Sequence, residues 1–76
     1  MINNLKRMEK LNNATISLVN YINSNLSNKF FASKTAVGYN VMITELKTGK
    51  TVYVTADEII GKGINIYNLT KGKLHE

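Results

Sequence analysis

Residues 36–55 decide the fold of this 76-residue chain, and they read AVGYNVMITELKTGKTVYVT. Two runs rich in β-branched and aromatic residues lie on either side of a short loop with Gly, which is the pattern of a β-hairpin. A two-residue turn at Thr48-Gly49 would pair Ile43 with Val54, whereas a three-residue loop with a bulge would pair Ile43 with Tyr53. The first register is preferred because it gathers the apolar side chains on one face. Those side chains are Val41, Ile43, Val52 and Val54.

The segment before the hairpin predicts a long amphipathic helix over residues 1–28. At the helical spacing of about 100° per residue, one apolar arc forms, with charged and Asn side chains opposite. The arc contains Met8, Leu11, Thr15, Leu18, Val19, Ile22 and Leu26. Two shorter helices divided at Asn12-Asn13 are an alternative, since Asn is a poor helix former and a good cap. A strand over residues 15–22 is another, although its alternation fails at Ser17 and Asn20.

The remaining segments are short. Residues 29–35 are expected to form a connector in which Phe30 and Phe31 point in opposite directions, so that one of them enters the core. A capping box at Thr55-Ala56-Asp57-Glu58 predicts a short helix over 56–60, which Gly61-Lys62-Gly63 ends. Residues 64–69 are expected to be a third strand and residues 70–76 a tail. The whole chain, residues 1–76, is then one α+β domain, with the long helix packed on a small three-stranded antiparallel sheet.

Composition excludes several classes of protein. The chain has no Cys, so disulfides, thiolate zinc sites and a catalytic Cys are all excluded. No apolar run approaches the roughly 20 residues of a membrane span. The abundance of Asn, Lys and Ile is typical of an AT-rich genome. We therefore expect a cytoplasmic protein of a low-GC bacterium or of a phage-infected host cell.

No group of residues indicates catalysis. Thr48-Gly49-Lys50-Thr51 resembles the end of a P-loop, but the earlier Gly is replaced by Thr44 and the segment joins two strands. His75 is the single His, and no neighbouring ligands accompany it. Asp57 and Glu58 diverge by about 100° on a helix, and capping accounts for both. We expect no enzyme activity, no cofactor and no metal.

Binding to another protein is the favoured function. The helix is longer than one small sheet needs, and its face at Met8, Leu11, Leu18 and Ile22 has the spacing of a helix–helix seam. Two alternatives are open for this face. It covers the protein's own sheet, or it contacts a host protein, as in a phage or mobile-element protein that modulates a host factor by occlusion. Association with a second copy of the chain through the same seam is a further expectation.

Nucleic-acid binding is the alternative. Ten basic residues oppose five acidic ones, for a net charge of +5. Five lysines fall in the hairpin and in later turns, where they could neutralise phosphates in a weak, sequence-tolerant way. They are Lys47, Lys50, Lys62, Lys71 and Lys73. Tyr39, Tyr53 or Tyr67 could stack on bases. The single Arg argues against base readout, since Arg makes most bidentate contacts with bases.

Overall fold

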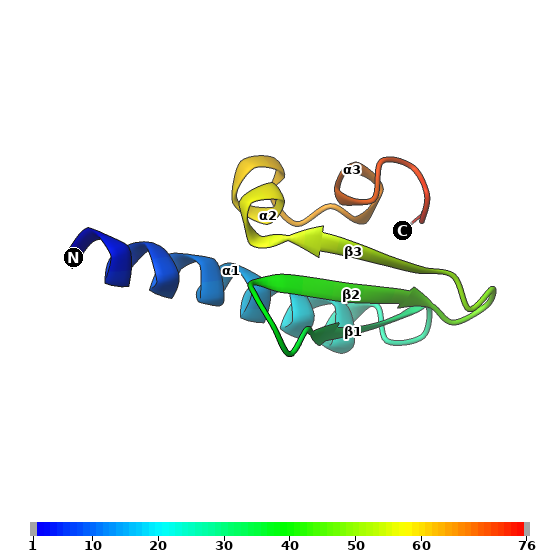
Figure 1. The fold of residues 1–76 in the computed structure, drawn as a ribbon. Coiled ribbons are helices and arrows are strands. Elements are labelled where there is room, and N and C mark those ends of the chain that lie inside the picture. Colours follow the sequence, from blue (N-terminus) through cyan, green and yellow to red (C-terminus); the bar gives the residue numbers. More distant parts are fainter. Residues whose placement is uncertain (1, 76) are drawn as a thin grey trace.

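The fold is that of an α+β protein, with one long helix and a three-stranded antiparallel sheet, as the sequence predicts (Figure 1). The computed structural model describes the backbone of residues 2–75 and the side chains of residues 5–75. The elements are α1 (Ile2–Asn25), β1 (Phe30–Lys34), β2 (Asn40–Glu45), β3 (Thr51–Thr55), α2 (Ala56–Lys62) and α3 (Ile66–Leu69). Met1 and Glu76, the outermost residues of the expected helix and tail, lie outside the described residues.

Helix α1 is continuous through Asn12 and Asn13, so neither the division into two helices nor the strand occurs. Asn13 is exposed and Asn12 is half-buried, and packing of Leu18 and Ile22 outweighs the weak helix propensity of Asn. The predicted end at residue 28 is wrong. The helix stops at Asn25, and Leu26 closes a turn by accepting hydrogen bonds from the N–H groups of Lys29 and Phe30.

The sheet has the order β1-β2-β3, and its third strand is not the predicted one. Residues 29–35, expected as a connector, contain β1, which pairs antiparallel with β2 from Phe30↔Glu45 to Lys34↔Val41. The extended backbone buries Phe30 and leaves Phe31 exposed, as predicted for adjacent residues in such a segment.

Residues 64–69 do not form a strand. Asn65 instead caps the single turn of α3, where its Oδ1 accepts a hydrogen bond from the Asn68 N–H at 2.9 Å. Ile66 and Leu69, three residues apart, are both buried by this turn. The predicted tail is also wrong for residues 70–75, because Leu74 is fully buried and Thr70 Oγ1 accepts a hydrogen bond from its N–H.

The hairpin has the predicted apolar face but a different register. Val41 pairs with Val54 and Ile43 with Val52, two residues away from the preferred register and one from the alternative. The loop is longer than the expected loops of two or three residues. Gly49 has a φ of +75°, and its N–H donates a hydrogen bond to the Glu45 carbonyl. A shift of two residues returns every side chain to the same face. The grouping of Val41, Ile43 and Val54 in the core is therefore unaffected.

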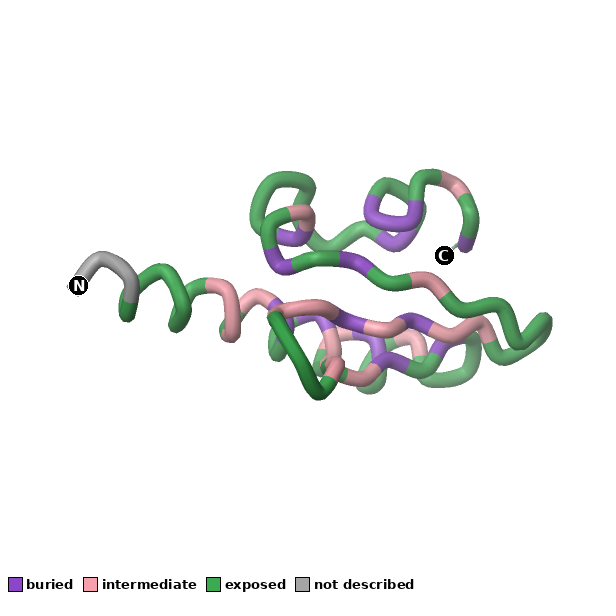
Figure 2. Tube along the Cα trace, in the orientation of Figure 1, coloured by how far each residue is buried: buried purple, intermediate pink, exposed green. Residues whose placement is uncertain are grey.

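The core lies between one face of the sheet and the helices. Helix α1 crosses β1 and β2, while α2 and α3 lie over β3 (Figure 1). Buried apolar side chains from every element meet there. They are Leu18, Ile22, Phe30, Ala32, Val41, Ile43, Val54, Ile59, Ile66, Leu69 and Leu74. The first described turns of α1 extend past the sheet and are exposed (Figure 2), which gives the molecule extents of 44 × 20 × 20 Å.

Helix α2 begins at the predicted capping box. The Thr55 hydroxyl accepts from the Glu58 N–H at 3.1 Å, and the Glu58 carboxylate accepts from the Thr55 N–H at 3.0 Å. The helix runs to Lys62, one half-turn beyond the predicted residue 60, and Gly63 follows at φ +77°. This cap fixes the path from the edge of the sheet to the helix that covers it.

Candidate protein interface

The helix face proposed from sequence is divided between core and surface. Leu18 and Ile22 are fully buried against the protein's own sheet, so they cannot contact a partner in this fold. Leu11 is partly buried, and Met8 is 48% exposed on the projecting turns. Only the N-terminal part of the predicted face is therefore available for binding.

The five lysines of the alternative site are all exposed but do not share one surface. Lys71 and Lys73 line a cleft beside β3 together with Glu58. Lys47 lines a different cleft, with Lys29 and Glu45. Lys50 ends the β2–β3 loop, and Lys62 ends α2.

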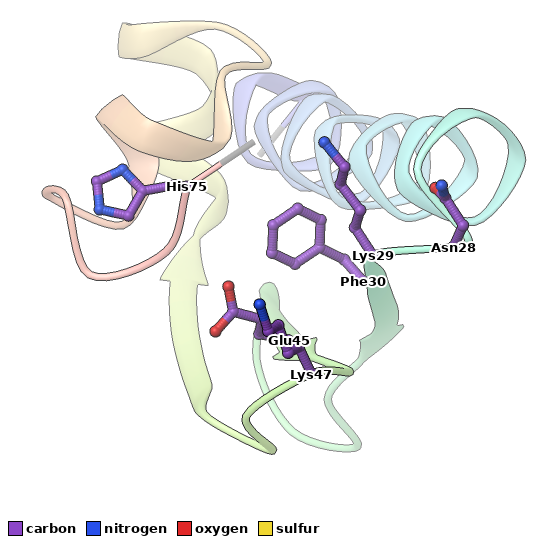
Figure 3. A pocket seen from close by; sticks show the side chains of 6 residues that line it. All are labelled: Asn28, Lys29, Phe30, Glu45, Lys47 and His75. Carbon is purple, nitrogen blue, oxygen red and sulfur yellow. The ribbon is translucent and has the colours of Figure 1, made fainter.

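The cleft at Lys47 has a volume of about 260 Å³ and is lined by Asn28, Lys29, Phe30, Glu45, Lys47 and His75. In Figure 3, the Phe30 ring and the Glu45 carboxylate point into it, and the His75 imidazole points away. His75 instead packs its ring 5.2 Å from that of Tyr67. Glu45 accepts a hydrogen bond from the Thr48 hydroxyl. The lining contains one carboxylate, two amines and one imidazole, so its chemistry offers charge pairing.

The outer face of the sheet, opposite the core, is a further exposed surface. Side chains alternate along each strand, so eight of them lie on this face. They are Phe31, Ser33, Asn40, Met42, Thr44, Thr51, Tyr53 and Thr55. The three helices that cover the sheet pack against its other side (Figure 1). Thr44 and Thr51 face each other across β2 and β3, with their hydroxyl oxygens 3.1 Å apart.

Three apolar side chains cross this outer face diagonally. Met42 is directly opposite Tyr53, and Phe31 on β1 is one diagonal step from Met42. Side chains at these positions are neighbours, since directly opposed Cβ atoms lie about 5 Å apart and diagonal ones about 7–8 Å apart. Phe31 is 50% exposed and Tyr53 is 65% exposed. Together they form an apolar surface that the protein leaves open.

None of these eight outer-face side chains is charged. Besides Tyr53, the polar members are the amide of Asn40 and the hydroxyls of Ser33, Thr44, Thr51 and Thr55. The hydroxyls of Thr44 and Thr51 already contact each other, and that of Thr55 caps α2. A face of this composition suits a neutral surface with a small number of hydrogen-bonding groups. It has nothing with which to neutralise a phosphate.

Sequence reasoning missed this face because it misplaced the strand that contributes Phe31. The adjacent aromatics Phe30-Phe31 were the available signal, since an extended segment must expose one of them if it buries the other. The chain matches no protein-family model, and it matches neither a curated protein nor a solved structure. Within the described residues, no helix is long and apolar enough to span a membrane. In the same part of the chain, no three His, Asp or Glu side chains gather as metal ligands.

Proposed function

We propose that this protein is a non-enzymatic protein-binding module whose outer sheet face, centred on Phe31, Met42 and Tyr53, docks on a neutral apolar surface of another protein. The observation that carries the proposal is that this face is both apolar and free of charge, although the chain has a net charge of +5. Exposed apolar patches on small proteins are typical of interaction sites.

The absence of charge favours a protein over a nucleic acid. Nucleic-acid binding draws most of its affinity from contacts between cationic side chains and phosphates. The lysines of this chain lie instead in the loops, on the helices and, for Lys34, at the end of β1, and four of them line two separate clefts. Aromatic rings on a sheet can stack on bases, but no Lys or Arg of the paired strands shares the outer face with Phe31 and Tyr53. Lys71 and Lys73 approach Tyr53 only from the cleft beside β3.

The rigid sheet also suits binding. Phe31 and Tyr53 are held by strands whose inner side chains are buried, so little backbone freedom is lost when a partner docks. Aromatic side chains supply large contact areas and are enriched at the centres of interfaces. Occlusion of a host factor, expected from the sequence, remains a prediction about the consequence of such binding.

Affinity capture from bacterial lysate with three forms of the protein tests the proposal. The wild type is compared with Phe31→Thr/Tyr53→Thr, in which the strands keep β-favouring residues. The matched control is Val37→Thr/Ile60→Thr, which removes two exposed apolar side chains elsewhere. We expect one protein to be retained by the wild type and the control and lost by the outer-face variant.

Salt dependence adds a second readout. Binding through a neutral face should change less than about threefold between roughly 50 mM and 200 mM salt, whereas several phosphate contacts would weaken binding by orders of magnitude. Loss of the bound protein from the control as well as the outer-face variant would contradict the proposal. So would steep salt dependence, or capture of nucleic acid alone.

A further inference from the structure

The two edge strands of the sheet, β1 and β3, differ in whether their outward backbone N–H and C=O groups are hydrogen-bonded. On β1, the Ala32 N–H donates to Asn23 Oδ1 at 3.0 Å, and Asn23 Nδ2 donates to the Ala32 carbonyl at 2.9 Å. The amide of Asn23 thereby pairs with Ala32 as a neighbouring strand would. The Phe30 N–H donates to the Leu26 carbonyl at 2.9 Å. Helix α1 thus closes most of the β1 edge.

The β3 edge has no such partner at its centre. The Glu45 N–H donates to the Lys50 carbonyl, and the Ala56 N–H donates to the Tyr39 carbonyl. In an antiparallel ladder these bonds alternate, so the even-numbered residues of β3 face β2 and the odd-numbered residues face outward. The Thr55 N–H donates a hydrogen bond to the Glu58 carboxylate. Among the described residues, none bonds to the outward N–H and C=O groups of Thr51 and Tyr53.

A cleft lies beside this open edge. It has a volume of about 130 Å³ and is lined by Val52, Tyr53, Glu58, Leu69, Thr70, Lys71 and Lys73. The volume is below the range of about 300–1,000 Å³ that is typical of small-molecule sites, and it suits a single side chain. Strand β3 itself, with the sequence TVYVT, has no Pro, Lys or bulge of the kind that protects exposed edges.

We infer that the β3 edge is a second binding site, which accepts an extended acidic segment of another protein as an added strand. The segment's backbone would pair with Thr51 and Tyr53, and one of its acidic side chains would enter the cleft between Lys71 and Lys73. Strand addition of this kind draws affinity from the main chain and specificity from alternate side chains.

The charges around the cleft favour this occupant. Lys71 and Lys73 line it, and Lys50 precedes β3. The one acid in the lining, Glu58, is already held by the N–H and hydroxyl of Thr55. A second copy of this chain would bring the same lysines to the same edge and would be repelled. An acidic strand would be attracted instead.

A peptide-binding experiment tests the inference directly. The probe is acetyl-Glu-Val-Glu-Val-Glu-Val-amide, with the Lys-Val peptide of the same pattern as its control. In isotope-labelled NMR spectra, we expect the acidic peptide to shift the Thr51 and Tyr53 amides and to protect them from solvent exchange. The Lys-Val peptide should bind at least about tenfold more weakly.

Two pairs of variants separate the contributions of charge and backbone. Lys71→Glu/Lys73→Glu should lower the affinity for the acidic peptide by about tenfold or more. Lys6→Glu/Lys10→Glu makes the same change of net charge and should leave that affinity unchanged. Thr51→Pro removes an outward N–H at the first residue of an edge strand and should abolish binding. Thr51→Ala retains that N–H and should bind normally. Circular dichroism checks that each variant is folded.

Several results would overturn the inference. They are equal binding of the two peptides, shifts confined to other residues, equal effects of the two Lys pairs, or a peptide-free dimer joined through β3. The Phe31→Thr variant distinguishes this site from the outer face. It should bind the acidic peptide as the wild type does, even if the function proposed for the outer face fails.

Discussion

The two faces of the sheet are built by the same three strands, yet they differ in what covers them. The inner face presents Phe30, Ile43 and Val54, which are buried beneath three helices. The outer face presents Phe31 and Tyr53, which are exposed, and Met42, which is partly buried. Apolar side chains on the inner face stabilise the fold. Similar side chains on the outer face contribute little to folding in this way, and we attribute them to binding.

The inner face should give the largest loss of stability. Leu18→Ala removes a fully buried side chain and should lower the free energy of unfolding by about 3 kcal/mol. Leu5→Ala, the same substitution on the projecting turns of α1, should change it by less than about 0.5 kcal/mol. Urea unfolding measures both. Equal effects would mean that α1 does not cover the sheet as described.

The link between α1 and β1 should give the next largest effect. Asn23→Ala leaves the N–H and C=O of buried Ala32 unpaired, and we expect a loss of about 1–2 kcal/mol. Asn20→Ala, on the exposed side of the same helix, gains helix propensity and should stabilise the protein by a few tenths of a kcal/mol. If both variants were stabilised, the hydrogen bonds between Asn23 and Ala32 would contribute nothing to the free energy of unfolding.

The capping box of α2 should make the stability of the fold depend on pH. The hydrogen bond from the Thr55 N–H holds the pKa of the Glu58 carboxyl below its ordinary value, with Lys62 and Lys71 adding to the effect. A depressed pKa stabilises the fold above the ordinary glutamate range, and that stability is lost as the pH falls through the folded value. In the Glu58→Gln variant, the midpoint temperature of unfolding should therefore fall less steeply with decreasing pH than in the wild type. An unchanged decline would contradict this contribution.

The outer face should have the smallest effect on stability. Phe31→Thr/Tyr53→Thr should alter the free energy of unfolding by less than about 1 kcal/mol, because both residues are at least half exposed and Thr suits a strand. Thermal unfolding measures this difference. A loss as large as that of Leu18→Ala would show that the face serves folding, and the contrast between the two faces would fail.

The sequence predicted the parts of the fold that local patterns determine. The capping box at Thr55 and Glu58 and the inward face of the hairpin follow from short-range chemistry, and both are confirmed. The position of the third strand depends on long-range pairing. Apolar and polar side chains alternate over residues 64–69 as in a strand, but Asn65 caps a helical turn there. Strand β1, by contrast, is fixed by β2 and by Asn23 from a distant helix.

The candidate site could be predicted only in part. An amphipathic stripe on a helix does not reveal how far the protein's own sheet covers it, and Leu18 and Ile22 are in fact internal. The position of the lysines around two clefts likewise depends on how the C-terminal segment folds back onto β3. The outer face became recognisable only once β1 was placed beside β2.

Site-specific photo-cross-linking shows whether the outer face contacts another protein. The amino acid p-benzoylphenylalanine is placed at residue 31 on the outer face or, in a separate protein, at residue 67. The native side chains are matched, since Phe31 is 50% and Tyr67 is 52% exposed. After irradiation in bacterial cells, we expect a discrete protein adduct from residue 31 and none of that mass from residue 67. Equal adducts from both positions, or nucleic-acid adducts from residue 31, would contradict this expectation.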